Sequence, residues 1–156
     1  MLWRLSAKQF EAQKGDANKQ AMSAIVESGE VPGLLGYHNG KAIAWCAIAP
    51  RGRYCALSRS RILRPLDDRP CWSVACLFID RAYRKMGVST QHLRAAAAYA
   101  KSQGAELVEA YPVEPKSDKE LPPAFAWTGI AKAFLRAGFI EVARRSPTRP
   151  IMRLDL

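Results

Sequence analysis

Residues 76–89, which read CLFIDRAYRKMGVS, decide the order of elements in this chain. The first four of these residues end an apolar run that begins at residue 71. Such a run is typical of a strand buried on both faces. A basic turn with Gly87 follows, and the alanine-rich stretch after it, which ends at Gly104, predicts a helix over residues 88–103. The stretch therefore predicts a strand, a tight turn and a helix N-terminus.

The turn between this strand and this helix has the chemistry of an anion site. The first amides of a helix lack an internal partner, and the helix dipole adds partial positive charge at the same end. Gly87 allows a ligand to approach the backbone, and Arg84 and Lys85 add full positive charges. Phosphate or pyrophosphate suits such a site, whereas the alternative is an ordinary solvated turn. The glycine patterns of P-loop and dinucleotide-binding proteins are absent from the sequence.

The rest of the chain alternates helical and strand patterns. A hairpin is predicted for residues 33–48, because Asn39 and Gly40 separate two apolar runs and both tolerate a positive φ. A helical region with a break at Gly15 is expected over residues 7–28. Another helix is expected over residues 128–137, with further strands over residues 2–5, 106–111, 139–144 and 151–154. Residues 51–70 and 112–123 are expected to be irregular.

Length, composition and charge limit the class of protein. The 156 residues suit one domain over residues 1–156, and 49% hydrophobic with 24% charged residues excludes a disordered chain. A run of about 18 apolar residues, as in a membrane span, is absent, and the N-terminal stretch lacks the long apolar segment of a secretory signal. We therefore expect a cytoplasmic protein without a membrane partner. The net charge of +10 suits an anionic ligand.

Three segments together resemble the GNAT superfamily of N-acetyltransferases. Residues 84–89, RKMGVS, resemble its [Q/R]-x-x-G-x-[G/A] signature, with Ser89 at the last position. Residues 134–139, FLRAGF, resemble its late Y-x-x-x-G-F element, and residues 36–45 resemble its central hairpin. The resemblance extends from about residue 31 to the end. It implies an α/β fold with a central mixed, mostly antiparallel sheet flanked by helices, and a V-shaped splay between strands over residues 77–79 and 107–111.

The resemblance also implies acetyl-CoA as cosubstrate and direct transfer of the acetyl group to an amine. Backbone amides over residues 84–89 would hold the pyrophosphate, and the strand over residues 77–79 would pair with the pantetheine arm. The residues expected to bind the cofactor are Leu77, Phe78, Ile79, Arg84, Lys85, Met86, Gly87, Val88, Ser89 and Phe134. Phe134 stands where many members have a tyrosine that protonates the leaving thiolate, and phenylalanine has no donor. Either another group or a water molecule protonates the thiolate, or the protein is a non-catalytic sensor that binds acyl-CoA.

Two catalytic candidates follow from strand alternation. Side chains in a strand alternate between faces, so Leu107, Glu109 and Tyr111 share one face. If that face lines the cleft, Glu109 is placed to act as a base, directly or through water, and Tyr111 to donate a proton to the thiolate. The alternative is that Glu109 forms an ion pair and Tyr111 packs at the end of the strand.

The acceptor and the partners are less constrained. Small amines, amino acids, aminoglycosides, polyamines and peptide termini all remain as acceptors, and a homodimer through residues 139–154 stays open. A nucleic-acid-binding domain is the other reading of the basic charge, but the pattern predicts no recognition helix, so no nucleic acid is expected. The four cysteines are expected to be reduced thiols, and no metal site is expected, because no histidine accompanies Cys71 and Cys76 at ligand spacing.

Overall fold

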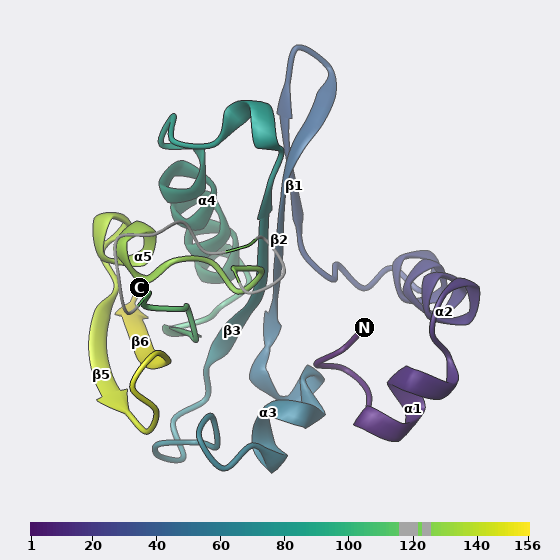
Figure 1. Cartoon of the computed structure of the whole chain (residues 1–156), viewed down its shortest axis with the longest axis horizontal. Helices are drawn as coiled ribbons and strands as arrows, with labels where there is room; N and C mark the ends of the chain where they lie inside the picture. Colours follow the sequence, from purple (N-terminus) through teal and green to yellow (C-terminus); the bar gives the residue numbers. More distant parts are fainter. Residues whose placement is uncertain (116–121, 123–125) are drawn as a thin grey trace.

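The computed structural model describes residues 1–115, 122 and 126–156 (Figure 1). Within them, a six-stranded sheet runs in the order β1-β2-β3-β4-β6-β5, and only β3 and β4 are parallel neighbours. The strands are β1 (Leu34–His38), β2 (Lys41–Pro50), β3 (Trp72–Ile79), β4 (Leu107–Ala110), β5 (Ile140–Arg144) and β6 (Pro150–Asp155). The mixed, mostly antiparallel sheet predicted from the sequence is thereby confirmed.

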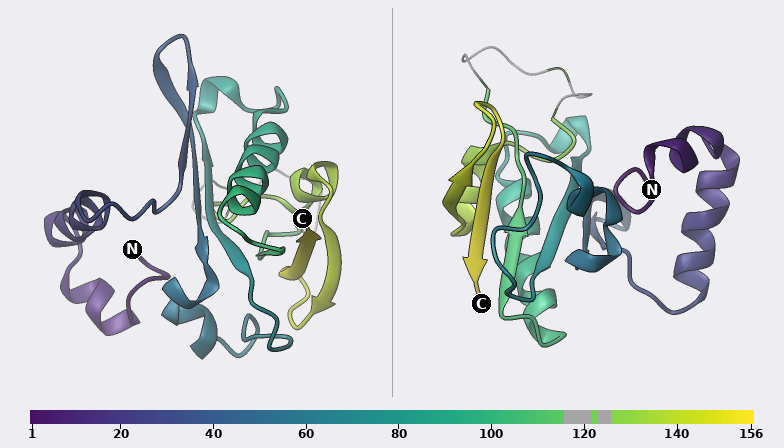
Figure 2. Two further views of the ribbon diagram at one scale, coloured as in Figure 1. Left: turned by 180° about the vertical axis from the view of Figure 1, so that it is seen from behind. Right: turned by 90° about the horizontal axis from the view of Figure 1, so that it is seen from below.

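Helices lie on both sides of this sheet. On one side are α4 (Val88–Ser102) and α5 (Ala131–Ala137), and on the other are α1 (Ala7–Ala12), α2 (Asp16–Glu27) and α3 (Cys55–Arg59), as Figure 2 shows from two directions. The main core fills the first side. Leu93, Ala96 and Ala100 of α4 recur at helical spacing and pack against β3 through Val74 and Leu77. A second cluster on the other side contains Tyr54, Leu57, Ala75 and Tyr111.

Strands β3 and β4 separate after three residue pairs. The last pair is Val74 with Ala110, so the predicted V-shaped splay is confirmed. Beyond this point the amide of Leu77 donates to the carbonyl of Trp127 at 2.8 Å. The amide of Val113 donates to the carbonyl of Gly129, also at 2.8 Å. Residues 127–131 therefore lie between the diverging strands.

A β-bulge on β3 marks the middle of the sheet. Ala47 pairs with Cys76 whereas Ile48 pairs with Val74, so Ala75 is an extra residue on β3. A bulge bends its strand and changes the direction of nearby side chains. As a result, Ala75 and Cys76 both line the same cavity on the α1–α2 side, although they are neighbours in a strand.

Some elements differ from the sequence-based expectations. Residues 2–5 form a turn, in which the amides of Arg4 and Leu5 donate to the carbonyl of Met1, and not a strand. The region 51–70 contains the short 3-10 helix η1 (Arg51–Arg53) and α3. The helix expected from residue 128 begins at Ala131, because Gly129 at φ +83° is not helical. Of the loop expected over residues 112–123, residues 116–121 and 123 lie outside the described residues.

The length and apolar character of the helices determine whether they could cross a membrane. Among the described residues, none of the helices combines the length and the apolar character that crossing a membrane requires.

Candidate active site

The turn from β3 to α4 is fixed by its own side chains. A second 3-10 helix, η2 (Arg81–Tyr83), follows Asp80, whose carboxylate accepts the amide of Ala82 at 3.0 Å and pairs with Lys41 Nζ at 3.0 Å. These two bonds hold the pKa of Asp80 below its usual value. Arg84 Nε donates to the carbonyl of Ile79 at 3.0 Å. The turn is therefore anchored to the end of β3 and to β2.

The backbone of this turn is left-handed at two positions. Lys85 has φ +63° and Gly87 has φ +80°, and α4 begins directly after Gly87. A left-handed non-glycine residue costs about 1–2 kcal/mol, and such strain collects at binding sites. A Cβ built on Gly87 would meet no atom within 4 Å among the described residues, so the space over the helix N-terminus is open. Open space at a helix N-terminus, together with Arg84 and Lys85, fits a pyrophosphate.

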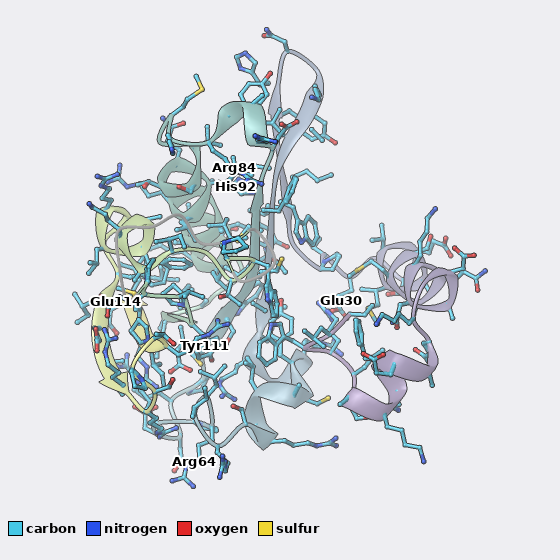
Figure 3. The ribbon with its side chains drawn as sticks, viewed as in Figure 1. Glu30, Arg64, Arg84, His92, Tyr111 and Glu114 are labelled. Atoms are coloured by element: carbon cyan, nitrogen blue, oxygen red, sulfur yellow. The ribbon has the colours of Figure 1, made fainter. Side chains whose placement is uncertain are left out.

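The β3 residues expected to meet the cofactor differ in exposure. Leu77 is buried and its amide is bonded to Trp127, whereas Phe78 is 53% exposed. Ile79 is partly buried and its carbonyl accepts from Arg84. In the turn, Met86 is 65% exposed. Figure 3 shows Arg84 near the N-terminal end of α4, well away from Tyr111 at the lower part of the sheet.

Phe134 lies inside the main core. Its side chain is fully buried and meets Phe139 edge-on, with ring centroids 5.3 Å apart. A Cβ built on Gly129 would lie 2.6 Å from Phe134 Cε2 and 3.1 Å from Leu77 Cδ2. Glycine at position 129 therefore allows residues 127–131 to pack directly on this ring. The contact expected between Phe134 and the cofactor stays a prediction.

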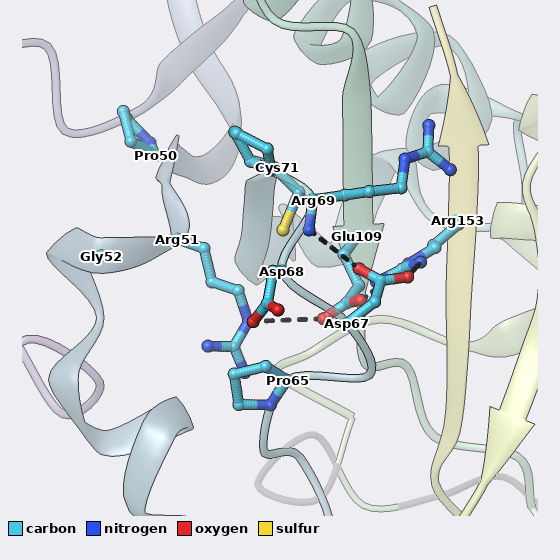
Figure 4. A pocket seen from close by; sticks show the side chains of 11 residues that line it. Pro50, Arg51, Gly52, Pro65, Asp67, Asp68, Arg69, Cys71, Glu109 and Arg153 are labelled. Atoms are coloured by element: carbon cyan, nitrogen blue, oxygen red, sulfur yellow. Dashed lines mark hydrogen bonds and ion pairs between the residues drawn. The ribbon is translucent and has the colours of Figure 1, made fainter.

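The alternation expected in β4 brings Glu109 and Tyr111 together. The Tyr111 hydroxyl donates to Glu109 Oε1 at 2.5 Å, and both side chains are fully buried. Arg153 Nε donates to Glu109 Oε2 at 2.9 Å, and Arg51 Nε lies 3.4 Å from Oε1 (Figure 4). Arg153 continues the network to Asp67, with bonds of 2.6 and 3.0 Å. The network ties β4 and β6 to residues 51–70.

Burial and charge keep the Tyr111 proton in place. Burial raises the pKa of Tyr111 above its usual value, and the neighbouring Glu109 carboxylate adds to this rise. The Ser73 hydroxyl lies 3.2 Å from the phenol oxygen. These contacts are those of an ion pair and a packed tyrosine, so the catalytic roles of both residues stay predictions.

Two cavities open on the α1–α2 side of the sheet. The first, of about 400 Å³, surrounds the network of Glu109; among its lining residues are Pro50, Arg51, Asp67, Asp68, Cys71 and Arg153 (Figure 4). The second, of about 270 Å³, lies at the β3 bulge and is called here the aromatic cavity. It is lined by Met1, Leu2, Trp3, Arg4, Phe10, Met22, Pro32, Trp45, Ala47, Tyr54, Ala75, Cys76 and Trp127. Among the described residues, no three His, Cys, Asp or Glu side chains are grouped to hold a metal ion.

Sequence reasoning missed the aromatic cavity. Its aromatic rings come from positions 3, 10, 45, 54 and 127, and no local spacing joins them. The chain is similar over residues 1–120 to the model of the acetyltransferase (GNAT) family. It belongs to the GNAT acetyltransferase family. Members of this family transfer an acetyl group from acetyl-CoA to an acceptor.

Solved structures share the fold of this GNAT protein at low sequence identity. A GNAT acetyltransferase from Listeria monocytogenes has a TM-score of 0.59 and 12% identity, over 97% of this chain and 77% of that one. A ribosomal-protein-alanine N-acetyltransferase from Brucella melitensis has a TM-score of 0.54 and 14% identity, over 89% and 76%. A NatC complex bound to Gag peptide and CoA has a TM-score of 0.54 and 11% identity, over 88% and 79%. No curated protein sequence matches the chain.

Proposed function

We propose that this GNAT protein is an N-acetyltransferase that moves the acetyl group of acetyl-CoA directly to an amine. The observation that carries this proposal is the left-handed turn at Lys85 and Gly87, which precedes α4 and follows the splayed strand β3. A positive helix end and a strand that has separated from its parallel neighbour are the two parts that a phosphate-bearing thioester with an extended arm requires.

The cofactor would be held mainly by backbone groups. The amides over residues 84–89 would bind the pyrophosphate, with Arg84 and Lys85 adding charge. The edge of β3 from Leu77 to Ile79 would hold the arm. Acetyl-CoA supplies the acetyl thioester. The turn and the β3 edge would orient this thioester toward the bulge at Ala75.

Glu109 and Tyr111 are the catalytic candidates in this reaction. Both lie on the sheet face that carries the bulge, since Tyr111 packs in one cluster with Tyr54 and Ala75. An ammonium acceptor must lose a proton before it attacks, and the thiolate must gain one. Arg153 and Arg51 each contact one oxygen of the Glu109 carboxylate, so the base would have to act from within this ion-pair network. The raised pKa of Tyr111 makes the phenol a weaker acid.

A non-catalytic acyl-CoA sensor is the second candidate function. It is favoured by Phe134, which offers no donor, and by the bond that commits the Tyr111 hydroxyl to Glu109. A sensor would bind the cofactor and release no thiol.

Thiol release from acetyl-CoA, measured with a panel of amines beside CoA binding by calorimetry, separates the two functions. We expect CoA binding and thiol release that depends on an amine. Binding without release for every amine would favour the sensor. Absence of binding would overturn both functions.

A further inference from the structure

Arg149, the residue directly before β6, has a partly buried side chain that is bonded only to neutral groups. Its Nη1 donates to the Thr128 hydroxyl at 2.6 Å and to the carbonyl oxygen of Tyr111 at 3.2 Å. Thr128 is itself only 2% exposed, so these bonds hold the guanidinium in one place before any ligand arrives. A charged group that is partly buried without a counter-ion is costly, and this indicates a site for an anion.

The other edge of this guanidinium is open. Because Nη1 carries both bonds, Nε and Nη2 have no hydrogen-bond partner among the described residues, and neither atom is fully buried. Solvent or a ligand can therefore reach them. The Nε–Nη2 edge of an arginine presents two parallel N–H donors, which match the two oxygens of a carboxylate.

The charge of Arg149 is not neutralised by the described part of the chain. Burial lowers the pKa of Arg149 below its usual value, and no carboxylate opposes the shift there. Glu114, whose amide donates to the carbonyl of the neighbouring Thr148, pairs with Arg144 instead, at 2.5 Å. One uncompensated positive charge suits one carboxylate, and it would repel a second ammonium group. Polyamines and aminoglycosides are therefore disfavoured at this position.

Arg149 lies on the sheet face that carries the β3 bulge. It precedes Ile151 by two residues, and side chains alternate along a strand, so the two side chains share a face. Ile151 packs in one cluster with Ala75 of the bulge. The Thr128 that accepts from Arg149 follows Trp127, whose ring lines the aromatic cavity beside the same bulge. Arg149 is therefore close to the place where the acetyl thioester is proposed to lie.

We infer that the acetyl acceptor is an amine that also carries a carboxylate, as amino acids do, and that Arg149 binds this carboxylate through Nε and Nη2. The amine of the acceptor would then point toward the β3 bulge. In the reaction an amide N–C bond forms and the thioester C–S bond breaks. The substrate ammonium gives up two protons, of which one ends on the coenzyme A sulfur and one is released. This assignment rests on the proposed function.

Matched acceptors test the inference. Thiol release from acetyl-CoA is measured with the standard L-amino acids, with their α-amides and with spermidine. For the amino acid that is turned over fastest, KM should be at least about tenfold below that of its amide, which lacks only the negative charge. Turnover of the amides or of spermidine in preference to the amino acids would overturn the acceptor class and leave acetyl transfer standing.

A binding measurement keeps the inference testable without turnover. If no amine releases thiol, the proposed function fails, and calorimetry with the N-acetyl-L-amino acids then decides the inference. Binding that is lost in Arg149→Gln would support the carboxylate site. Absence of such binding would overturn it.

The Arg149→Gln variant isolates the guanidinium. It should raise KM for the amino acid at least about tenfold, leave KM for the matching amide nearly unchanged and leave the Kd for CoA unchanged. Arg149→Lys keeps the charge without the two parallel donors, so it should restore part of the preference. The matched control is Arg145→Gln in the same β5–β6 connection, because Arg145 also donates only to carbonyl oxygens, those of Arg64 and Pro65. Urea denaturation checks that both variants fold. An unchanged preference for the amino acid over its amide in Arg149→Gln would contradict the inference.

Discussion

The amide of Leu77 donates to the carbonyl oxygen of Trp127 at 2.8 Å, beyond the last pair of β3 and β4. The bond joins β3 to residues 127–131, which are in turn bonded to Val113. A ligand that pairs with the Leu77 amide must replace this bond. The segment that closes the splay is therefore also the segment that a cofactor arm has to displace or accommodate.

We predict that Gly129→Ala loosens this segment. Gly129 has φ +83°, and a Cβ would lie 2.6 Å from Phe134 Cε2. Left-handed strain of about 1–2 kcal/mol and overpacking of about 1–3 kcal/mol should both lower the free energy of unfolding. Gly15→Ala is the control, since Gly15 has φ +90° but open space, and it should show the strain alone. If urea denaturation shows that Gly129→Ala and Gly15→Ala lose the same free energy of unfolding, the packing role of Gly129 is refuted.

Gly87→Trp should abolish CoA binding. The indole would fill the open space over the start of α4 and block the amides there. Gly104→Trp is matched to it, because Gly104 has φ +82°, also meets no described atom within 4 Å, and lies past the other end of α4. Both variants should lose similar stability, and calorimetry should find CoA binding only in Gly104→Trp. CoA affinity retained in Gly87→Trp would remove the turn from the cofactor site.

Glu109→Gln should reduce turnover and stability while CoA affinity persists. Loss of the buried charge leaves Arg51 without a carboxylate partner and Arg153 with Asp67 alone, at a cost on the order of 3 kcal/mol. Asp67→Asn is the control, because it removes the half-exposed partner of the same Arg153 and should cost less than about 1 kcal/mol. A purified Glu109→Gln enzyme with a normal rate across pH would exclude Glu109 as a base.

His92 should make the fold less stable in mild acid. Burial lowers the pKa of His92 below its usual 6.5, although its bond to the Leu34 carbonyl opposes the shift. The folded state then binds fewer protons than the unfolded state, so stability is full above pH 6.5 and falls as the pH drops below it. The slope cannot exceed about 1.4 kcal/mol per pH unit. Denaturation between pH 7 and 5 should show this loss, and His92→Gln should flatten it, whereas an unchanged slope in His92→Gln would rule out His92 as its source.

Hydrophobic spacing and turn residues in the sequence were sufficient to predict the elements that depend on neighbouring residues alone. The helix that ends before Gly104, the hairpin at Asn39 and the apolar strand β3 follow from spacing and turn residues. The resemblance added the splay. The pattern failed at residues 2–5, where the apolar side chains belong to a turn that packs its Trp3 against Trp127.

The site's polar network could not be predicted because its members are distant in sequence. Arg51 reaches Glu109 across 58 residues of sequence, and Arg153 binds both Glu109 and Asp67. Charge composition does not distinguish a buried guanidinium from a solvated one. Only the alternation of β4, which set Glu109 and Tyr111 on one face, was readable in advance.

Helices α1 and α2 contribute one buried residue, Asn18, in the described chain. Elements with so little burial unfold locally at low free energy, long before the sheet does. They also supply Phe10 and Met22 to the aromatic cavity. The outer wall of the aromatic cavity is thus the first part of the molecule to open. Trypsin should reach Lys8, Lys14 and Lys19 early, and an occupied cavity should slow that cleavage even where the global midpoint of unfolding does not move.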